Sequence, residues 1–210
     1  MSHVIITIAR EYGSGGRELG KYLANRLGIG YYDRELLGLT AEVTGINRQI
    51  FENADEQLKT TTLYKVASNV YRGERIQPEQ EEAISNESLF AYQAKVIQEL
   101  SKYESFVLIG RCGDYILDNQ ENVVKIFVYA PMEARLERMG ELSSLRDQEL
   151  RNLILRTDKQ RSDYYYYHTH RVWNDARNYH LIINSAEMNR EQSYGLVRAY
   201  IDIKLNGFTL

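Results

Sequence analysis

Short runs of consecutive apolar residues recur along this chain, and each is typical of a strand buried on both faces. The first run, Val4–Ala9, is rich in β-branched residues, and the second ends at Asp33. The third is closed by Gly110, and the fourth contains Lys125 as its single charge. The predicted strands cover residues 4–9, 29–32, 106–109, 123–129 and 180–184.

Apolar residues spaced three or four positions apart predict helices between these strands. Leu19, Leu23 and Leu27 form one such stripe, and Gly28 ends it. Pro131 suits the first turn of a later helix, because the first turn needs no N–H donor there. Further stripes run through residues 90–97, 132–139, 150–154 and 197–201.

The order of the first elements predicts the fold class. A strand, a glycine-rich loop, a helix and a second strand follow one another within residues 4–33. This is a βαβ unit, in which the strands lie parallel and the crossover is right-handed. We therefore predict an α/β fold, a three-layer doubly wound parallel sheet of about five strands. Residues 34–100 interrupt this alternation with a mostly helical insert.

The composition fits one sizeable domain, since the chain has 210 residues, of which 43% are hydrophobic. Its net charge of −3, with acids and bases interspersed, argues against nucleic acid as a partner. Cys112 is the only cysteine, which excludes an internal disulfide and suits a reducing compartment. The N-terminal apolar run is too short for a membrane span and lacks a basic leader. We expect a cytoplasmic protein with no membrane partner.

The loop between the first strand and its helix contains three glycines in four residues, Gly13, Gly15 and Gly16. Glycine accepts positive φ and lets backbone approach a ligand closely. Successive N–H groups then converge on one anion, and the following helix adds its positive dipole end. The alternative is a plain tight turn, which needs fewer glycines. We predict a phosphate-binding loop.

Neither common phosphate motif is complete in this loop. In a Walker A alignment, Arg10 replaces the first glycine, Gly16 replaces the lysine and Arg17 the next position. In a dinucleotide-binding alignment, Gly13 and Gly15 fit and Asp33 lies at a suitable distance, but Glu18 replaces the third glycine. These motifs alone leave a nucleotide kinase-like enzyme, a nucleotide- or anion-binding regulatory module and a dinucleotide oxidoreductase open.

Landmarks along nearly the whole chain, in a fixed order, resemble the cytidylate kinase-like family, relatives of the P-loop nucleoside monophosphate kinases with an altered Walker A loop. The strongest is the run Ile6–Leu19. Here Gly16 stands in place of the Walker lysine, and Glu18 in place of a metal-binding threonine. The other landmarks are Tyr31-Tyr32-Asp33, Gly110-Arg111-Cys112, Asp158–Arg161 with Tyr164-Tyr165, Asn178-Tyr179 and Asn184.

The resemblance implies transfer of the ATP γ-phosphoryl group to a small acceptor, possibly CMP or another nucleoside monophosphate, with Mg²⁺ bridging the phosphates. It implies one kinase-like domain over residues 1–210: a core of 1–33, 101–140 and 176–210, a monophosphate-binding insert of 34–100, and a lid of 141–175. The ATP site would comprise Arg10, Gly13, Ser14, Gly15, Gly16, Arg17 and Glu18.

Arginines near the carboxyl ends of the strands are the candidate catalytic groups, because a planar guanidinium grips phosphate oxygens and stays charged. Arg17 opens the first helix, Arg10 ends the first strand and Arg111 follows the third. All three belong to the edge where such sheets bind ligands. Arg111 also resembles the substrate-binding arginine of cytidylate kinases. The alternative for each is a solvated surface residue.

Three further residues are candidates for substrate contacts, and two of them, Asp158 and Arg161, are also candidate catalytic residues. Asp158 and Arg161 are three positions apart and share a helix face, where they either act on the substrate or form an ordinary surface ion pair. Asp33 either contacts the acceptor nucleoside or caps the next helix. We expect no protein metal site, since His168 and His170 have no other ligand type at suitable spacing.

Overall fold

The computed structural model of the chain describes residues 3–33, 62–73 and 86–206. The chain forms two compact units, one of residues 1–31 and 106–210 and the other of residues 32–105. A five-stranded sheet has the order β2-β3-β1-β4-β5, and β1 pairs in parallel with both β3 and β4, as β4 does with β5. The strands are β1 (Ile5–Arg10), β2 (Gly30–Tyr32), β3 (Phe106–Ile109), β4 (Val123–Tyr129) and β5 (Leu181–Asn184).

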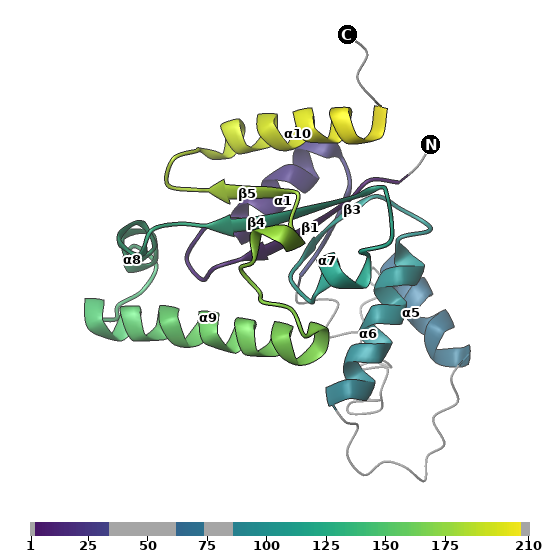
Figure 1. Cartoon of the computed structure of the whole chain (residues 1–210), viewed down its shortest axis with the longest axis horizontal. Helices are drawn as coiled ribbons and strands as arrows, with labels where there is room; N and C mark the ends of the chain where they lie inside the picture. Colours follow the sequence, from purple (N-terminus) through teal and green to yellow (C-terminus); the bar gives the residue numbers. More distant parts are fainter. Residues whose placement is uncertain (1–2, 34–61, 74–85, 207–210) are drawn as a thin grey trace. The chain divides into compact units, whose positions relative to one another are not determined.

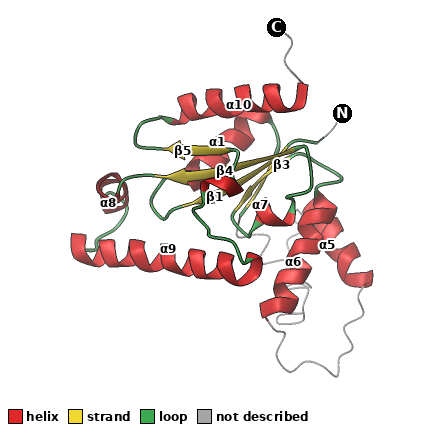
Figure 2. Ribbon diagram, viewed as in Figure 1, coloured by secondary structure: helices red, strands yellow, loops and turns green. Residues whose placement is uncertain are grey.

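Helices lie on both sides of this sheet (Figures 1 and 2), which makes the larger unit three layers thick. Helices α1 (Gly16–Leu27) and α10 (Arg190–Asn206) cover one face. Their apolar stripes, including Leu19, Leu23 and Val197, form one core with the side chains of that face. On the other face, Phe127 of β4 packs edge-on against Trp173, with ring centroids 5.3 Å apart. The predicted three-layer parallel sheet is confirmed, with strand ends shifted by about one residue.

Three helices and a short 3-10 turn lie along the chain between β3 and β5, together with β4. Helix α7 (Gly113–Ile116) comes directly after β3, and α8 (Met132–Gly140) comes after β4 with Pro131 as its N-cap. Helix α9 (Asp147–Thr169) is one continuous helix that packs against α8, and η2 (Ala176–Asn178) precedes β5. The region 141–175, expected to be a lid, is therefore mainly one long helix.

The second unit contains α5 (Thr62–Gly73) and α6 (Asn86–Leu100), which pack against each other. Val66 and Ile97 are buried within it, and the Tyr92 hydroxyl donates a 2.7 Å hydrogen bond to the Ala67 carbonyl. Most of the predicted insert 34–100, namely 34–61 and 74–85, lies outside the described residues. Within the described ranges, no helix is long and apolar enough to cross a membrane.

Candidate phosphate-binding site

The loop between β1 and α1 has the backbone conformation that its glycines allow. Gly13 and Gly15 have φ values of +77° and +76°, and Gly15 is the N-cap of α1. The Ser14 hydroxyl turns back to donate a 2.9 Å hydrogen bond to the Glu11 carbonyl. A β-carbon at Gly16 would come within 2.6 Å of the Arg10 β-carbon, so the backbone here packs too closely for a side chain.

The N–H groups of this loop remain available to a ligand. Those of Gly13, Gly15 and Gly16 have no hydrogen-bond acceptor anywhere in the described part of the chain. Backbone donors near a helix N-terminus, in a loop with left-handed residues, form the concave arrangement that binds anions. The geometry therefore suits an anion at these N–H groups better than it suits a plain tight turn.

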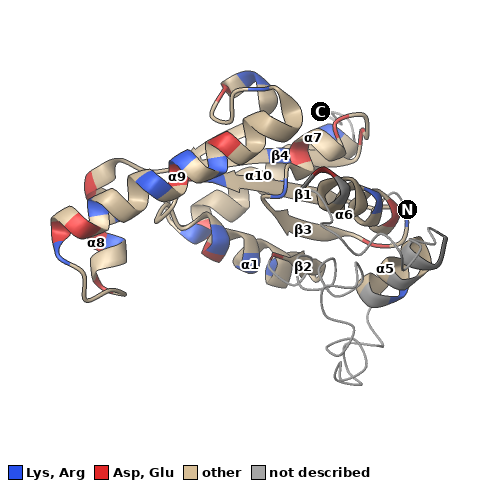
Figure 3. Cartoon of the chain, turned by 90° about the horizontal axis from the view of Figure 1, so that it is seen from below, with Lys and Arg blue, Asp and Glu red and all other residues tan. Residues whose placement is uncertain are grey.

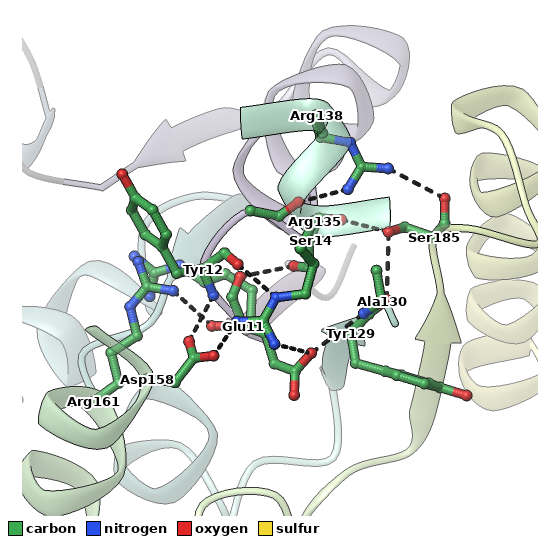
Figure 4. A network of polar contacts seen from close by, with 12 residues as sticks. Glu11, Tyr12, Ser14, Tyr129, Ala130, Arg135, Arg138, Asp158, Arg161 and Ser185 are labelled. Atoms are coloured by element: carbon green, nitrogen blue, oxygen red, sulfur yellow. Dashed lines mark hydrogen bonds and ion pairs between the residues drawn. The ribbon is translucent and has the colours of Figure 1, made fainter. Parts of the chain in front are cut away.

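The carbonyl groups of the same loop are held by arginines from α8 (Figure 4). The Arg135 Nε–H donates a 2.8 Å hydrogen bond to the Tyr12 carbonyl. Arg138 donates to the Gly13 carbonyl at 2.6 Å and to the Ser185 carbonyl at 3.5 Å, and the Ser185 hydroxyl donates to the Ser14 carbonyl. These hydrogen bonds fix the loop through its carbonyl groups. They leave the N–H groups of Gly13, Gly15 and Gly16 for an anion.

Arg135 is the centre of a buried charge network, since only 6% of its side chain is exposed. It forms a 3.1 Å ion pair with Glu11 and a second ion pair with Asp158 of α9. Glu11 also accepts the Ala130 N–H at 3.3 Å. Burial raises the pKa of the Glu11 carboxyl, and the neighbouring Arg135 charge opposes that rise. This network connects α8, α9 and the loop (Figure 4).

Asp158 and Arg161, expected on one helix face near the substrate, both contact the loop. Asp158 accepts the Tyr12 N–H at 2.7 Å as well as pairing with Arg135. Arg161 donates a 2.9 Å hydrogen bond to the Arg10 carbonyl, and its guanidinium lies 5.5 Å from the centre of the Tyr12 ring. The structure therefore brings both residues to the phosphate loop.

The remaining predicted residues of α1 and β1 lie around the same loop. Arg17 and Glu18 are exposed on the first turn of α1. The Arg10 side chain extends from Gly16 toward Gly110, where a β-carbon would overlap its guanidinium. Arg10 therefore connects the loop after β1 with the turn after β3. Asp33 is buried in the other compact unit.

The turn after β3 contains three consecutive left-handed residues, which sequence reasoning missed. Gly110, Arg111 and Cys112 have φ values of +70°, +59° and +53°. Arg111 is half-buried. Burial raises the pKa of the Tyr164 hydroxyl on α9, and the positive charge of Arg111 opposes part of that rise. Cys112 is buried, and burial raises the pKa of its thiol to about 12, which suppresses the nucleophilic thiolate.

Sequence reasoning also missed Arg135 and Arg138, because the clearest pattern in residues 132–139 is the apolar stripe of a helix. They are three residues apart on a helix that follows a strand at the carboxyl edge, the same signal that identified Arg111. Lys and Arg alternate with Asp and Glu along α8 and α9 (Figure 3), so neither helix presents charges of a single sign. No group of three metal-ligating side chains occurs among the residues that the structure describes.

The comparison with protein families bears on the three open alternatives. The model of the cytidylate kinase-like family matches residues 5–187, which include the glycine loop, the Arg111 turn and α9. The chain belongs to the cytidylate kinase-like family. The predicted resemblance is therefore confirmed, and membership favours a nucleotide kinase-like protein over a dinucleotide oxidoreductase.

Individual relatives of this cytidylate kinase-like protein agree with the family match. Cytidylate kinase of Thermosipho africanus (strain TCF52B) is 28% identical over 175 residues, which are 74% of this chain and 77% of that protein. An uncharacterized protein from Eubacterium ventriosum ATCC 27560 has a TM-score of 0.70 at 23% identity, covering 95% of this chain and 99% of the other. Shikimate kinase from Bacteroides thetaiotaomicron has a TM-score of 0.50 at 15% identity, covering 95% and 98%. These structures share the fold.

Proposed function

We propose that this protein is a phosphotransferase that moves the γ-phosphoryl group of ATP to a nucleoside monophosphate, with CMP as the first candidate. The observation that carries the proposal is the loop after β1, whose Gly13, Gly15 and Gly16 N–H groups have no acceptor in the described chain. The similarity to a protein named cytidylate kinase supports CMP as the acceptor.

In this proposal the loop N–H groups bind phosphate oxygens of ATP, and arginines supply the charge that the Walker lysine provides elsewhere. Arg17, at the N-terminus of α1, and Arg10, beside Gly16, are the nearest predicted cations. Phosphoryl transfer depends mainly on such positioning and charge. Mg²⁺, when bound, would neutralise phosphate charge, and Glu18, exposed on the first turn of α1, offers a carboxylate oxygen of the kind that Mg²⁺ accepts.

The acceptor site belongs to the same proposal. Arg111 would hold the acceptor phosphate and Asp33 its nucleoside, with 34–100 as the monophosphate-binding insert and 141–175 as the lid. Asp158 and Arg161 would act on the substrates from α9. Both already bond to backbone groups of the loop, which holds them beside the proposed phosphate site.

The experiment is a magnesium-dependent ATP turnover assay with a panel of nucleoside monophosphates, on wild type and Arg17→Ala. We expect transfer to one monophosphate and a loss of at least about 100-fold in kcat/KM for the variant, since one lost charge contact at a transferring phosphate costs a few kcal/mol. Arg177→Ala is the matched control, because Arg177 is 89% exposed and outside the site. No transfer to any monophosphate would contradict the proposal.

A second candidate is a nucleotide-binding regulatory module without turnover. Its support is Gly16, where the missing lysine cannot simply be restored, because Arg10 and Val128 fill the space of a side chain. If the wild-type protein binds ATP in calorimetry but transfers its phosphoryl group to no acceptor, that result would favour this function over the kinase.

A further inference from the structure

The turn that presents Arg111 is strained, and something in the structure must hold it. Arg111 and Cys112 both have positive φ values, following Gly110 in the same conformation. A left-handed conformation is unfavourable for a residue that has a β-carbon, because that atom comes too close to the following carbonyl oxygen. Two such residues in succession persist only where surrounding contacts compensate for that cost.

The contact directly after this turn is a buried hydrogen bond. Asp114, with 4% exposure, accepts a 2.6 Å hydrogen bond from the hydroxyl of Tyr165, which is itself 3% exposed. Between them and the turn, Gly113 packs so tightly that a β-carbon would come within 2.6 Å of Leu108. Asp114 therefore sits in a fixed position, three residues after Arg111.

The end of α9 holds this region at more than one point. Burial raises the pKa of the hydroxyl of Tyr164, the neighbour of Tyr165, and Arg111 lies close enough for its guanidinium charge to oppose part of that rise. Just beyond α9, Arg171 donates a 2.9 Å hydrogen bond to Asp118, and its guanidinium lies 5.0 Å from the centre of the Tyr115 ring. The Arg111 side chain thus lies near the same end of α9 that holds the residues after the turn.

We propose that Asp114 and Tyr165 are positioning residues for Arg111, and that their buried hydrogen bond maintains the left-handed turn from which Arg111 binds the acceptor phosphate. The inference rests on the proposed function for the role of Arg111 in binding the acceptor phosphate and for the identity of the acceptor. A purely structural role would lower stability and change binding of both substrates alike. A positioning role predicts a selective loss in acceptor binding.

The chain contains a reporter of this turn that needs no substrate. Cys112 is its only cysteine, is buried and is part of the turn. We would measure the rate at which dithiodipyridine modifies Cys112 in the wild type and in Tyr165→Phe. Loss of a buried hydrogen bond costs about 1–3 kcal/mol, so we expect modification to accelerate by at least about tenfold.

Two controls separate local opening from general loss of stability. Tyr166→Phe removes a hydroxyl from the next residue of α9, which is 58% exposed, and should leave the rate unchanged. Val197→Ala weakens the core on the opposite face of the sheet. It shows how much the rate of Cys112 modification rises when the Tm falls without any change near the turn. Asp114→Asn keeps an acceptor oxygen for Tyr165 and should retain most of the protection.

The same variants are then compared in CMP kinase assays. We expect Tyr165→Phe to raise the KM for CMP about tenfold while the KM for ATP stays within about twofold, in proportion to the lost hydrogen bond. Unchanged Cys112 modification, or equal changes in both KM values, would overturn the inference. A third outcome separates the two proposals. If Cys112 is modified faster in Tyr165→Phe but the wild-type protein phosphorylates no monophosphate, the link between the Asp114–Tyr165 hydrogen bond and the turn is supported, and the proposed function is overturned.

Discussion

Two loops at the carboxyl edge of the sheet adopt left-handed backbone conformations by opposite means. The loop after β1 uses glycines, Gly13 and Gly15, and is gripped from outside by charged side chains of α8 and α9. The turn after β3 places Arg111 and Cys112 in the same conformation, and the residues just after it are held by the buried hydrogen bond between Asp114 and Tyr165. The two loops are neighbours because β1 and β3 pair in parallel.

The difference matches what each loop has to present. The first loop offers backbone N–H groups, so it needs close approach and no side chains. In the proposed function the second offers the Arg111 side chain, so glycine cannot serve there and the strain must be compensated by other contacts. We infer that ion pairs hold the first loop and that a buried hydrogen bond holds the second, and the predictions below test this contrast.

The largest expected effect is at Arg135, the charged centre of the first loop. Arg135→Ala leaves Glu11 and Asp158 as largely buried carboxylates without their shared cation. Removing one partner of a buried ion pair costs about 3–5 kcal/mol, and we expect a loss of this size in urea unfolding. Arg171→Ala, at the second loop, removes a pair whose arginine is 39% exposed and should cost less than about 1 kcal/mol. Equal losses would contradict the contrast.

A smaller effect is expected from restoring the Walker lysine. Gly16→Lys places a β-carbon 2.6 Å from the Arg10 β-carbon and 3.1 Å from that of Val128, and neither atom is the flexible end of a side chain. Overpacking of this kind costs about 1–3 kcal/mol, so we expect a lower Tm and no gain in ATP affinity.

Gly140→Lys is the matched control for that experiment, because no atom lies within 4 Å of a β-carbon built there. Its Tm should stay close to the wild-type value. A stable Gly16→Lys variant with tighter ATP binding would show that the loop can rearrange. It would contradict the explanation that close packing by Arg10 and Val128 excludes a lysine at position 16.

The strands and the glycine loop were predictable because they depend on local pattern. Buried parallel strands are continuous apolar runs, and three glycines in four residues mark a special backbone. The contacts of Asp158 were not predictable, because the i, i+3 spacing suggested a pairing with Arg161. In the folded chain it pairs instead with Arg135, which is 23 residues away, and only tertiary packing brings the two together.

The left-handed turn at Arg111 was equally hidden, because only Gly110 signals a positive φ and the next two residues normally avoid it. Its support comes from Tyr165, one of four consecutive tyrosines on α9 of which it alone is fully buried. The sequence pattern of Tyr164–Tyr167 does not indicate which ring faces inward, since a helix rotates each by 100° relative to the last. Packing against α7 decides that.

The smallest expected effect compares the same substitution in both loops. Asp158→Asn weakens the ion pair with Arg135 and should cost about 1–2 kcal/mol at pH 7. Asp114→Asn keeps a bond to Tyr165 and removes a buried charge, so it should cost nothing or stabilise by up to about 1 kcal/mol. Urea unfolding of both variants at pH 7 and pH 4 measures the difference.

The pH dependence gives the sign of the Asp114 effect. Burial raises the pKa of the Asp114 carboxyl in the folded protein, so the folded state holds the proton more tightly than the unfolded state. The stability linked to this group is therefore fully present below the ordinary carboxyl pKa and is lost as the pH rises through the raised value. Asparagine cannot ionise, so the advantage of Asp114→Asn over wild type should grow from pH 4 to pH 7. If Asp114→Asn instead loses as much stability as Asp158→Asn at pH 7, the negative charge of Asp114, and not a hydrogen bond that asparagine can also accept, holds the second loop.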